Sequence, residues 1–291
     1  MGTSTMSWLL DPFQSDFTQR AGLICIMVGI LAPVVGTWIS LRKLAYLGDA
    51  MSHSVLGGVA LGFAWFGTNA VLPGALVAGI LMALVIHFLS QNRRIATDSV
   101  IAVVGSGMFA LGALLLSKLD TNVSISHFLF GQLLTVNSID LWITLVLTIS
   151  AVGFVWFRFD DLKFATFDRD HATQIGIRVQ RLDAAMLVLL AVCVVVCLNT
   201  VGIALTVSLL ITPTATARLF FNNVSSITRA AIAIGLTEVL AGFIVAYHFD
   251  LSPGPAITLG ATIVFIVLYA IRFATSDRTY VHHTHDHDHS H

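Results

Sequence analysis

The chain has 291 residues, of which 56% are hydrophobic and only 11% are charged, and its mean hydropathy is +0.87. A soluble domain carries about 25% charged residues, so this composition excludes an ordinary water-soluble protein. The formal net charge is −1, and basic residues nowhere cluster with aromatic ones, which excludes a nucleic-acid-binding face.

The chain begins with a polar segment, residues 1–20, that lacks the basic start and the cleavage signature of a signal peptide. We therefore expect this segment to be an extracytoplasmic lead-in. Residues 21–272 follow as the predicted transmembrane domain, and residues 273–291 form a polar tail.

The transmembrane domain is predicted from runs of apolar residues, because a spanning helix needs about 20 of them. We predict an all-α polytopic membrane protein with about nine spans. They are 21–41, 46–66, 69–89, 98–117, 139–157, 183–198, 200–217, 227–248 and 254–272. The count falls to eight if 183–217 crosses only once. Asn199 and Thr200 stand at the middle of that region, where we place a tight turn.

The basic residues orient the chain, since lysine and arginine favour the cytoplasmic side of a membrane. With nine spans and the N-terminus outside, every lysine and arginine except Arg20 and Lys118 falls on that side, as does the tail. The longest cytoplasmic segment, residues 158–181, is too short for a catalytic domain. No G-x-x-x-x-G-K-[ST] loop occurs. We therefore expect no enzyme activity, no permanently bound cofactor, and energy from an ion gradient or another subunit.

Two polar residues lie inside the second predicted span, where a charge costs roughly 2.5–3.5 kcal/mol. Asp49 and His53 are four residues apart, so both project from one helix face. A carboxylate and an imidazole at this spacing form a two-ligand arm for Mn²⁺, Fe²⁺ or Zn²⁺. A two-fold dimer would supply four ligands. The alternative is structural: Asp49 reaches the cytoplasmic surface and His53 hydrogen-bonds a neighbouring helix.

Two other regions carry candidate polar groups. Glu238 lies in the eighth predicted span, and we expect it to hydrogen-bond a serine or threonine of a neighbouring helix. The chain ends in a histidine-rich tract with two aspartates, a composition typical of flexible metal binding. An expression tag or an incidental solvated tail are alternatives, and the interleaved Asp, Thr and Ser favour a native tail. Its histidines are His282, His283, His285, His287, His289 and His291.

Four stretches in order along the chain match motifs of one protein family. The sequence LRKLAYLGDAMSHSVLGGVA at 41–60 resembles the second-helix signature of the ABC-3 permease family. HFLFG at 127–131 resembles its extracellular loop motif, and FDRDHATQIG at 167–176 resembles its cytoplasmic coupling segment. LITPTATAR at 210–218 resembles its Thr-Pro-x-Ala-Thr-Ala stretch. The resemblance covers residues 20–272.

Such permeases are the membrane subunits of bacterial importers for manganese, zinc and iron. The resemblance implies a type II importer fold in the bacterial cell membrane and a two-fold homodimer. It also implies two cytoplasmic ATP-hydrolysing subunits and an extracytoplasmic metal-binding protein. It places Asp49 and His53 on the family's metal-coordinating pair. The residues that it places in the ATPase-coupling segment include Phe167, Asp168, Ala172 and Gly176.

Two features bear on the metal. The Gly-Asp-Ala-x-Ser-His sequence around Asp49 resembles manganese and iron members more than zinc members, which tend to have Gly-Asp-Thr. The histidine-rich tail suits Zn²⁺ at least as well as Mn²⁺. We give more weight to the motif inside the membrane and expect Mn²⁺, with Zn²⁺ or Fe²⁺ as alternatives. Gly57 stands where manganese members often have proline, and we expect it to loosen the helix beyond His53.

Two further classes of function fit parts of the sequence. A gradient-driven secondary transporter would use Asp49 or Glu238 to carry protons and would move metal without an ATPase. A membrane metal sensor or scaffold would depend on the tail alone. The importer subunit accounts for more of the motifs, and we take it as the leading hypothesis.

Overall fold

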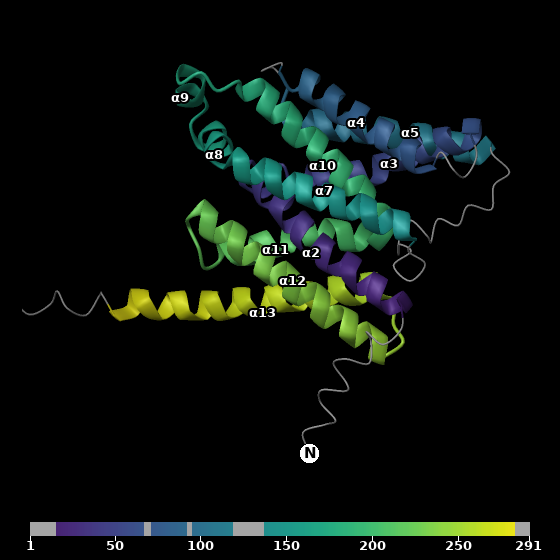
Figure 1. The fold of residues 1–291 in the computed structure, drawn as a ribbon. Coiled ribbons are helices and arrows are strands. Elements are labelled where there is room, and N and C mark those ends of the chain that lie inside the picture. The colour runs from purple at the N-terminus through teal and green to yellow at the C-terminus, as the bar shows by residue number, and fades with distance from the viewer. Residues whose placement is uncertain (1–15, 67–70, 92–94, 119–136, 283–291) are drawn as a thin grey trace, which may run out of the picture.

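The computed structural model describes residues 16–66, 71–91, 95–118 and 137–282. Within these ranges the chain forms helices joined by turns, and the long helices pack into one bundle with α8 and α9 at one end (Figure 1). The elements are α2 (Asp16–Leu41), α3 (Ala45–Phe66), α4 (Val71–Leu89), α5 (Thr97–Lys118), α7 (Ser138–Phe157), α8 (Phe159–Phe167), α9 (Arg169–Gln174), α10 (Val179–Val201), α11 (Ile203–Arg218), α12 (Val224–His248) and α13 (Pro253–His282).

A helix overlaps each predicted span, which confirms the all-α polytopic fold. In the described parts of the chain, seven helices are long and apolar enough to cross a membrane, namely α2, α4, α5, α7, α10, α12 and α13. The apolar helix α11 has only 16 residues. Helix α3 has 22 residues, but Asp49 and His53 lower its hydropathy. Nine crossings therefore remain a prediction.

The region 183–217 contains two helices, α10 and α11, that meet at Gly202. The turn lies a few residues beyond the predicted position. Gly202 has φ +84°, a conformation that glycine adopts without steric cost. Asn199 and Thr200 instead complete the last turn of α10. The Thr200 hydroxyl donates to the Val196 carbonyl at 3.0 Å, and the Asn199 side chain donates to Asp140 at 3.3 Å.

Helix α2 is the centre of the bundle, and glycines let its neighbours approach its backbone. A Cβ atom built on Gly36 would lie 1.9 Å from the Leu210 carbonyl oxygen of α11. A Cβ atom built on Gly235 of α12 would lie 2.9 Å from the Gly29 carbonyl oxygen. Small residues at such crossings bring helix backbones together in lipid, where van der Waals packing drives helix association.

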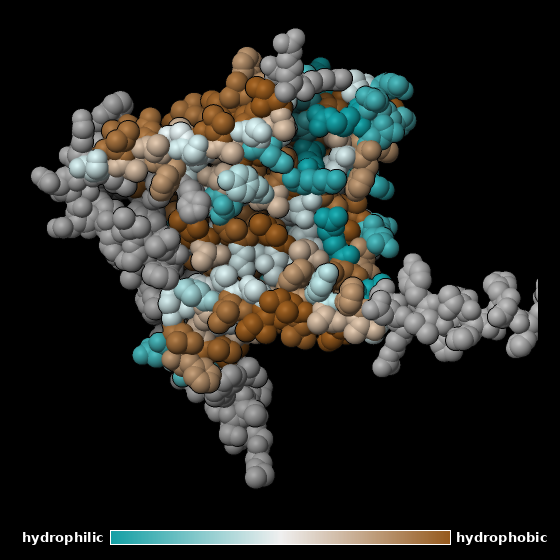
Figure 2. Space-filling view, turned by 180° about the vertical axis from the view of Figure 1, so that it is seen from behind, coloured by the Kyte–Doolittle hydropathy of each residue, from teal (hydrophilic) through white to brown (hydrophobic). Residues whose placement is uncertain are grey.

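The outer helices expose apolar side chains, as a lipid-facing surface requires. On α7 these include Trp142 and Val146, and on α13 they include Ile263 and Val267. Figure 2 shows hydrophilic residues gathered toward the end of the molecule from which α13 projects, with apolar residues covering much of the remaining face. The start of α2 and the end of α13 lie at opposite ends of the bundle (Figure 1).

We expect Gly36→Ala to destabilise the protein, because its methyl group would push α11 away from α2. Overpacking of this kind costs about 1–3 kcal/mol. The thermal unfolding midpoint of the detergent-purified protein should fall by several degrees. Gly153→Ala is the matched control, since a Cβ atom there meets no atom within 4 Å. Equal midpoints for the two variants would contradict the close approach of α2 and α11.

Candidate functional site

Helix α3 carries Asp49 and His53, the predicted metal-ligand pair that we call the metal arm. Helix α5 packs closely along α3. A Cβ atom built on Gly57 would lie 2.8 Å from the Met108 carbonyl oxygen of α5. The Ser54 hydroxyl donates to the Ala50 carbonyl of its own helix at 2.6 Å and to the Gly105 carbonyl of α5 at 3.2 Å. These contacts fix which face of α3 is turned toward α5.

Gly57 does not interrupt α3, which is helical from Ala45 to Phe66. Its lack of a side chain allows the Met108 carbonyl of α5 to come close. The expected loosening beyond His53 is therefore not seen, because neighbouring backbone fills the space at Gly57.

Two more helices hold α3 from other sides. A Cβ atom on Gly58 would lie 2.5 Å from the Gly74 carbonyl oxygen of α4, and one on Gly48 would lie 3.3 Å from a Leu210 methyl group of α11. The Ser52 hydroxyl is buried and donates to the Gly48 carbonyl at 2.9 Å. The helix is thus closely packed on several sides along its length, with α11 next to Asp49 and α4 further along.

Asp49 lines a cavity of about 340 Å³ between α3 and α5. The cavity is lined by Tyr46, Asp49 and Ala50 of α3 and by Ala102, Gly105, Ser106 and Phe109 of α5. Asp49 is half-buried, whereas Tyr46 and Phe109 are exposed at 53% and 45%. The carboxylate therefore sits in a recess that is open at the surface of the single chain.

His53 lies one turn beyond Asp49 on the same face of α3, as the spacing predicts. Its side chain is outside the part of the structure that is described. Among the described side chains, no three His, Cys, Asp or Glu residues gather into a group. A carboxylate with one imidazole is an incomplete ligand set for a divalent transition metal.

Glu238 does not make the hydrogen bond that we expected. It is only 8% exposed on α12, and neither carboxylate oxygen has a hydrogen-bond partner among the described residues. Buried hydroxyls on adjacent helices have other partners: Thr206 donates to the Gly202 carbonyl at 2.7 Å, and the Thr37 and Thr214 hydroxyls hydrogen-bond to each other at 3.2 Å. Burial without a partner is costly for such a group.

The predicted coupling segment 167–176 is a helical turn at the end of the bundle (Figure 1). Helix α8 ends at Phe167, and the Asp168 carboxylate caps α9 by accepting a hydrogen bond from the His171 amide at 2.9 Å. Ala172 is buried, whereas Phe167 is 62% exposed. Gly176 turns the chain with φ +86°. The segment thus has an anchored inner face and an exposed outer face.

Sequence reasoning missed the ion pairs beside this segment. Both oxygens of Asp183, near the start of α10, are paired with arginines. The Arg42 guanidinium contacts Oδ1 at 2.7 Å, and the Arg169 guanidinium contacts Oδ2 at 2.5 Å. We call these three residues the Asp183 network. The sequence identifies Arg42 only as one of the cytoplasmic basic residues, and no local pattern pairs it with a residue 141 positions away.

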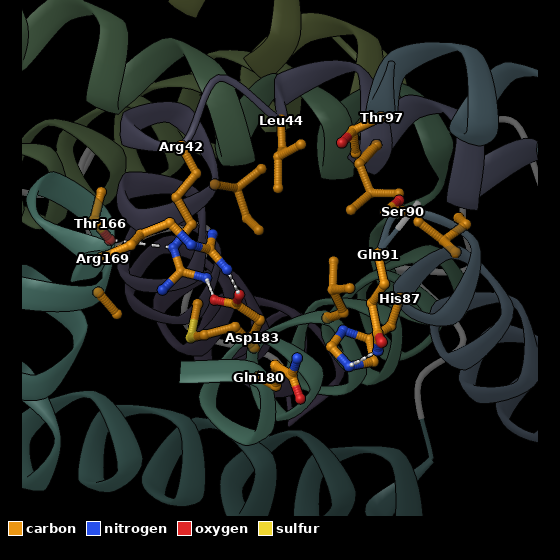
Figure 3. Close-up of a pocket in the computed structure, with 16 residues that line it drawn as sticks. Arg42, Leu44, His87, Ser90, Gln91, Thr97, Thr166, Arg169, Gln180 and Asp183 are labelled. Carbon is orange, nitrogen blue, oxygen red and sulfur yellow. Dashed lines mark hydrogen bonds and ion pairs between the residues drawn. The ribbon is translucent and has the colours of Figure 1, made fainter. Parts of the chain in front are cut away.

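The Asp183 network forms one wall of a cavity of about 600 Å³ (Figure 3). His87 of α4 and Gln91, just beyond the end of α4, lie across the cavity from it. Burial lowers the pKa of the Arg42 guanidinium, and the neighbouring Asp183 carboxylate acts to raise it. Arg42 also donates to the Thr166 hydroxyl of α8 at 3.2 Å. The turn between α2 and α3 is thereby joined to α8, α9 and α10.

Several predicted site residues fall outside the described structure. They are the loop motif at 127–131 and the tail histidines at positions 283, 285, 287, 289 and 291. His282 is the last residue of α13, which continues well past the predicted end of the span at 272.

The comparisons with known proteins agree with the motifs. Residues 14–272 match the family model described as ABC 3 transport family. The chain is 37% identical over 264 residues to the manganese transport system membrane protein MntC of Listeria innocua, covering 91% of this chain and 94% of that protein. It is 33% identical over 261 residues to the chelated iron transport system membrane protein YfeD of Yersinia pestis, covering 90% and 87%.

A solved structure shares the fold. PsaBC from Streptococcus pneumoniae in complex with Fab superposes with a TM-score of 0.79 at 32% sequence identity, covering 91% of this chain and 95% of that chain. The family model spans nearly all of the described helices. The chain is therefore a multi-pass membrane protein that belongs to the ABC 3 transport family of permeases.

Proposed function

We propose that this chain is the permease subunit of an ATP-driven importer of Mn²⁺. The observation that carries the proposal is the position of Asp49 at a recess between α3 and α5, with His53 one helical turn further along α3. Support comes from relatives of nearly equal length that are named for manganese transport. An iron-transport relative keeps Fe²⁺ as an alternative, and Zn²⁺ stays as another on ligand chemistry.

The metal site is completed by a second copy of the chain. One α3 offers a carboxylate and an imidazole, and a two-fold axis beside the Asp49 recess would bring two such pairs together. The exposed Tyr46 and Phe109 at its mouth are suited to this contact, because burial of aromatic surface stabilises interfaces. Four ligands suffice to replace part of the hydration shell of the ion, and an ion held by so few groups can also leave.

The energy comes from two ATPase subunits in the cytoplasm, docked on α8 and α9. The exposed Phe167 and the capped α9 helix offer a shaped surface for this contact. In this orientation the N-terminus lies outside the cell and the C-terminus inside, and a metal-binding protein delivers the ion to the outer end. The membrane is the bacterial plasma membrane.

The test uses the complex of this chain with its ATPase and its metal-binding protein, reconstituted in liposomes. We expect ATP-dependent accumulation of ⁵⁴Mn²⁺ that unlabelled Mn²⁺ suppresses at lower concentration than Zn²⁺ or Fe²⁺ does. Stronger competition by Zn²⁺ or Fe²⁺ would reassign the metal. The burial of Glu238 with no hydrogen-bond partner among the described residues favours the gradient-driven alternative. That alternative predicts accumulation by the chain alone under a proton gradient. Such accumulation would contradict the importer.

Asp49→Ala and His53→Ala should each abolish Mn²⁺ uptake, because each removes one of the two ligands that a chain provides. Expression and co-purification of the ATPase should be unchanged. Asp98→Ala is the matched control, since it removes an exposed carboxylate at the start of α5 and should keep normal uptake. Normal uptake by both site variants would refute the assignment of the site.

Removal of residues 282–291 should leave the maximal rate of Mn²⁺ uptake intact, because the residues that line the Asp49 recess belong to α3 and α5. We expect a change at most in how uptake responds to cytoplasmic metal. Uptake at rising intracellular Mn²⁺ measures this response. Complete loss of uptake in the truncated chain would favour the sensor hypothesis.

A further inference from the structure

The Asp183 network joins the exposed coupling segment to the turn that leads into the metal arm. Asp183 uses a different oxygen for each guanidinium, so it holds Arg169 of α9 and Arg42 of the α2–α3 turn at the same time. The Arg42 and Asp183 side chains are only 11% and 15% exposed. Ion pairs in such surroundings are screened weakly, and loss of one partner leaves a buried charge uncompensated.

The turn between Arg42 and α3 is held by backbone hydrogen bonds. The Arg42 amide donates to the Trp38 carbonyl at 3.1 Å, and the Leu44 amide donates to the Ile39 carbonyl at 2.9 Å. Lys43 between them has φ +60°, which fixes the direction in which α3 leaves the turn. Helix α3 begins at Ala45, so Asp49 lies about one helical turn into α3. A displacement of Arg42 therefore reaches Asp49 through this short hydrogen-bonded turn and the first turn of α3.

Apolar packing attaches the coupling segment to the same end of α2. The Trp38 indole meets the Phe159 ring of α8 edge-to-face, with 5.4 Å between the ring centroids. Trp38, Ala172 and Leu182 belong to one buried cluster, which joins α2, α9 and α10. Because of these contacts, we expect α8, α9 and the adjacent ends of α2 and α10 to move together as one rigid body.

The other side of the network faces open space. The cavity of about 600 Å³ separates Arg42 and Asp183 from His87 of α4 and from Gln91 just beyond the end of α4 (Figure 3). Close packing therefore links the network to α8, α9 and α10, and the cavity leaves room for this unit to move relative to α4. Packed helices can move together only where one side of them borders open space, since a filled core resists displacement.

We propose that the Asp183 network transmits movement of α9 to the metal arm on α3. Arg42, Asp183 and Arg169 are positioning residues in this scheme: they contact no metal, and they couple the ATPase-facing segment to Asp49. The inference rests on the proposed function, because it needs an ATPase that moves α9. A network that only stabilises the fold would affect the amount of protein and leave the yield of transport per ATP unchanged.

The experiment measures Mn²⁺ transported per ATP hydrolysed by the reconstituted permease–ATPase complex with its metal-binding protein. Arg169→Gln removes the link to α9 while the Arg42–Asp183 pair remains. Its side chain is 61% exposed, so the variant should fold. We expect the ratio to fall at least about fivefold, the lower range of coupling between sites. The maximal ATPase rate and the co-purified ATPase should stay unchanged, and Arg169→Lys should restore most of the ratio.

Arg158→Gln is the matched control. Arg158 is a similarly exposed arginine next to α8, paired with Asp161 at 2.7 Å, and its pair does not reach the α2–α3 turn. This variant should keep the normal ratio. An equal fall for Arg158→Gln, or an unchanged ratio for Arg169→Gln, would overturn the inference.

Asp183→Asn separates transmission from ATPase docking, because Asp183 is too buried to contact another subunit. We expect it to lower the ratio as well, and the double variant with Arg169→Gln to be no worse than Asp183→Asn alone, since both changes break one path. Additive losses with reduced ATPase co-purification would assign Arg169 to docking and overturn the inference.

A wild-type complex that moves no metal overturns the proposed function, whereas an unchanged ratio in Arg169→Gln overturns only the role of the Asp183 network.

Discussion

Close packing of α3 against three helices is the constraint on which the candidate site depends. Lipid chains are as apolar as the side chains of the bundle, so the hydrophobic effect does not draw helices together within the membrane, and short-range contact must do so. Gly48, Gly57 and Gly58 allow α11, α5 and α4 to approach α3 from different sides. With these sides occupied, Asp49 is turned toward the recess between α3 and α5.

The cost of charge in a low-dielectric environment explains the arrangement of the ionisable residues. The Asp183 network stands at the end of the bundle, where α2 ends and α10 begins, and its two arginines share one carboxylate. Glu238 is the contrasting case, buried on α12 without a described partner. Charge is thus either neutralised at the ends of helices or confined to a few costly positions inside them, where a role in transport is expected.

The sequence predicted the helices well, because apolar runs of about 20 residues are a direct physical signature of spanning segments. It also predicted that Asp49 and His53 share a face, since that follows from helical periodicity alone. The turn between α10 and α11 was misplaced, because Asn199 and Thr200 are turn-forming residues only when their side chains have no better partner. Here the Asn199 side chain donates to Asp140 of α7 and the Thr200 hydroxyl donates to a carbonyl of α10, and Gly202 makes the turn.

What the sequence by itself determined is local: which segments are helical, which residues share a helix face, and where basic residues lie along the chain. Only the tertiary structure decided which side chains meet. Arg42 and Asp183 are 141 positions apart, and whether they pair depends on the rotation and crossing of α2 and α10. The surroundings of Glu238, which hold no hydrogen-bond partner among the described residues, and the role of Gly57 were decided in the same way. Contacts between helices arise from packing geometry, and no local pattern encodes that geometry.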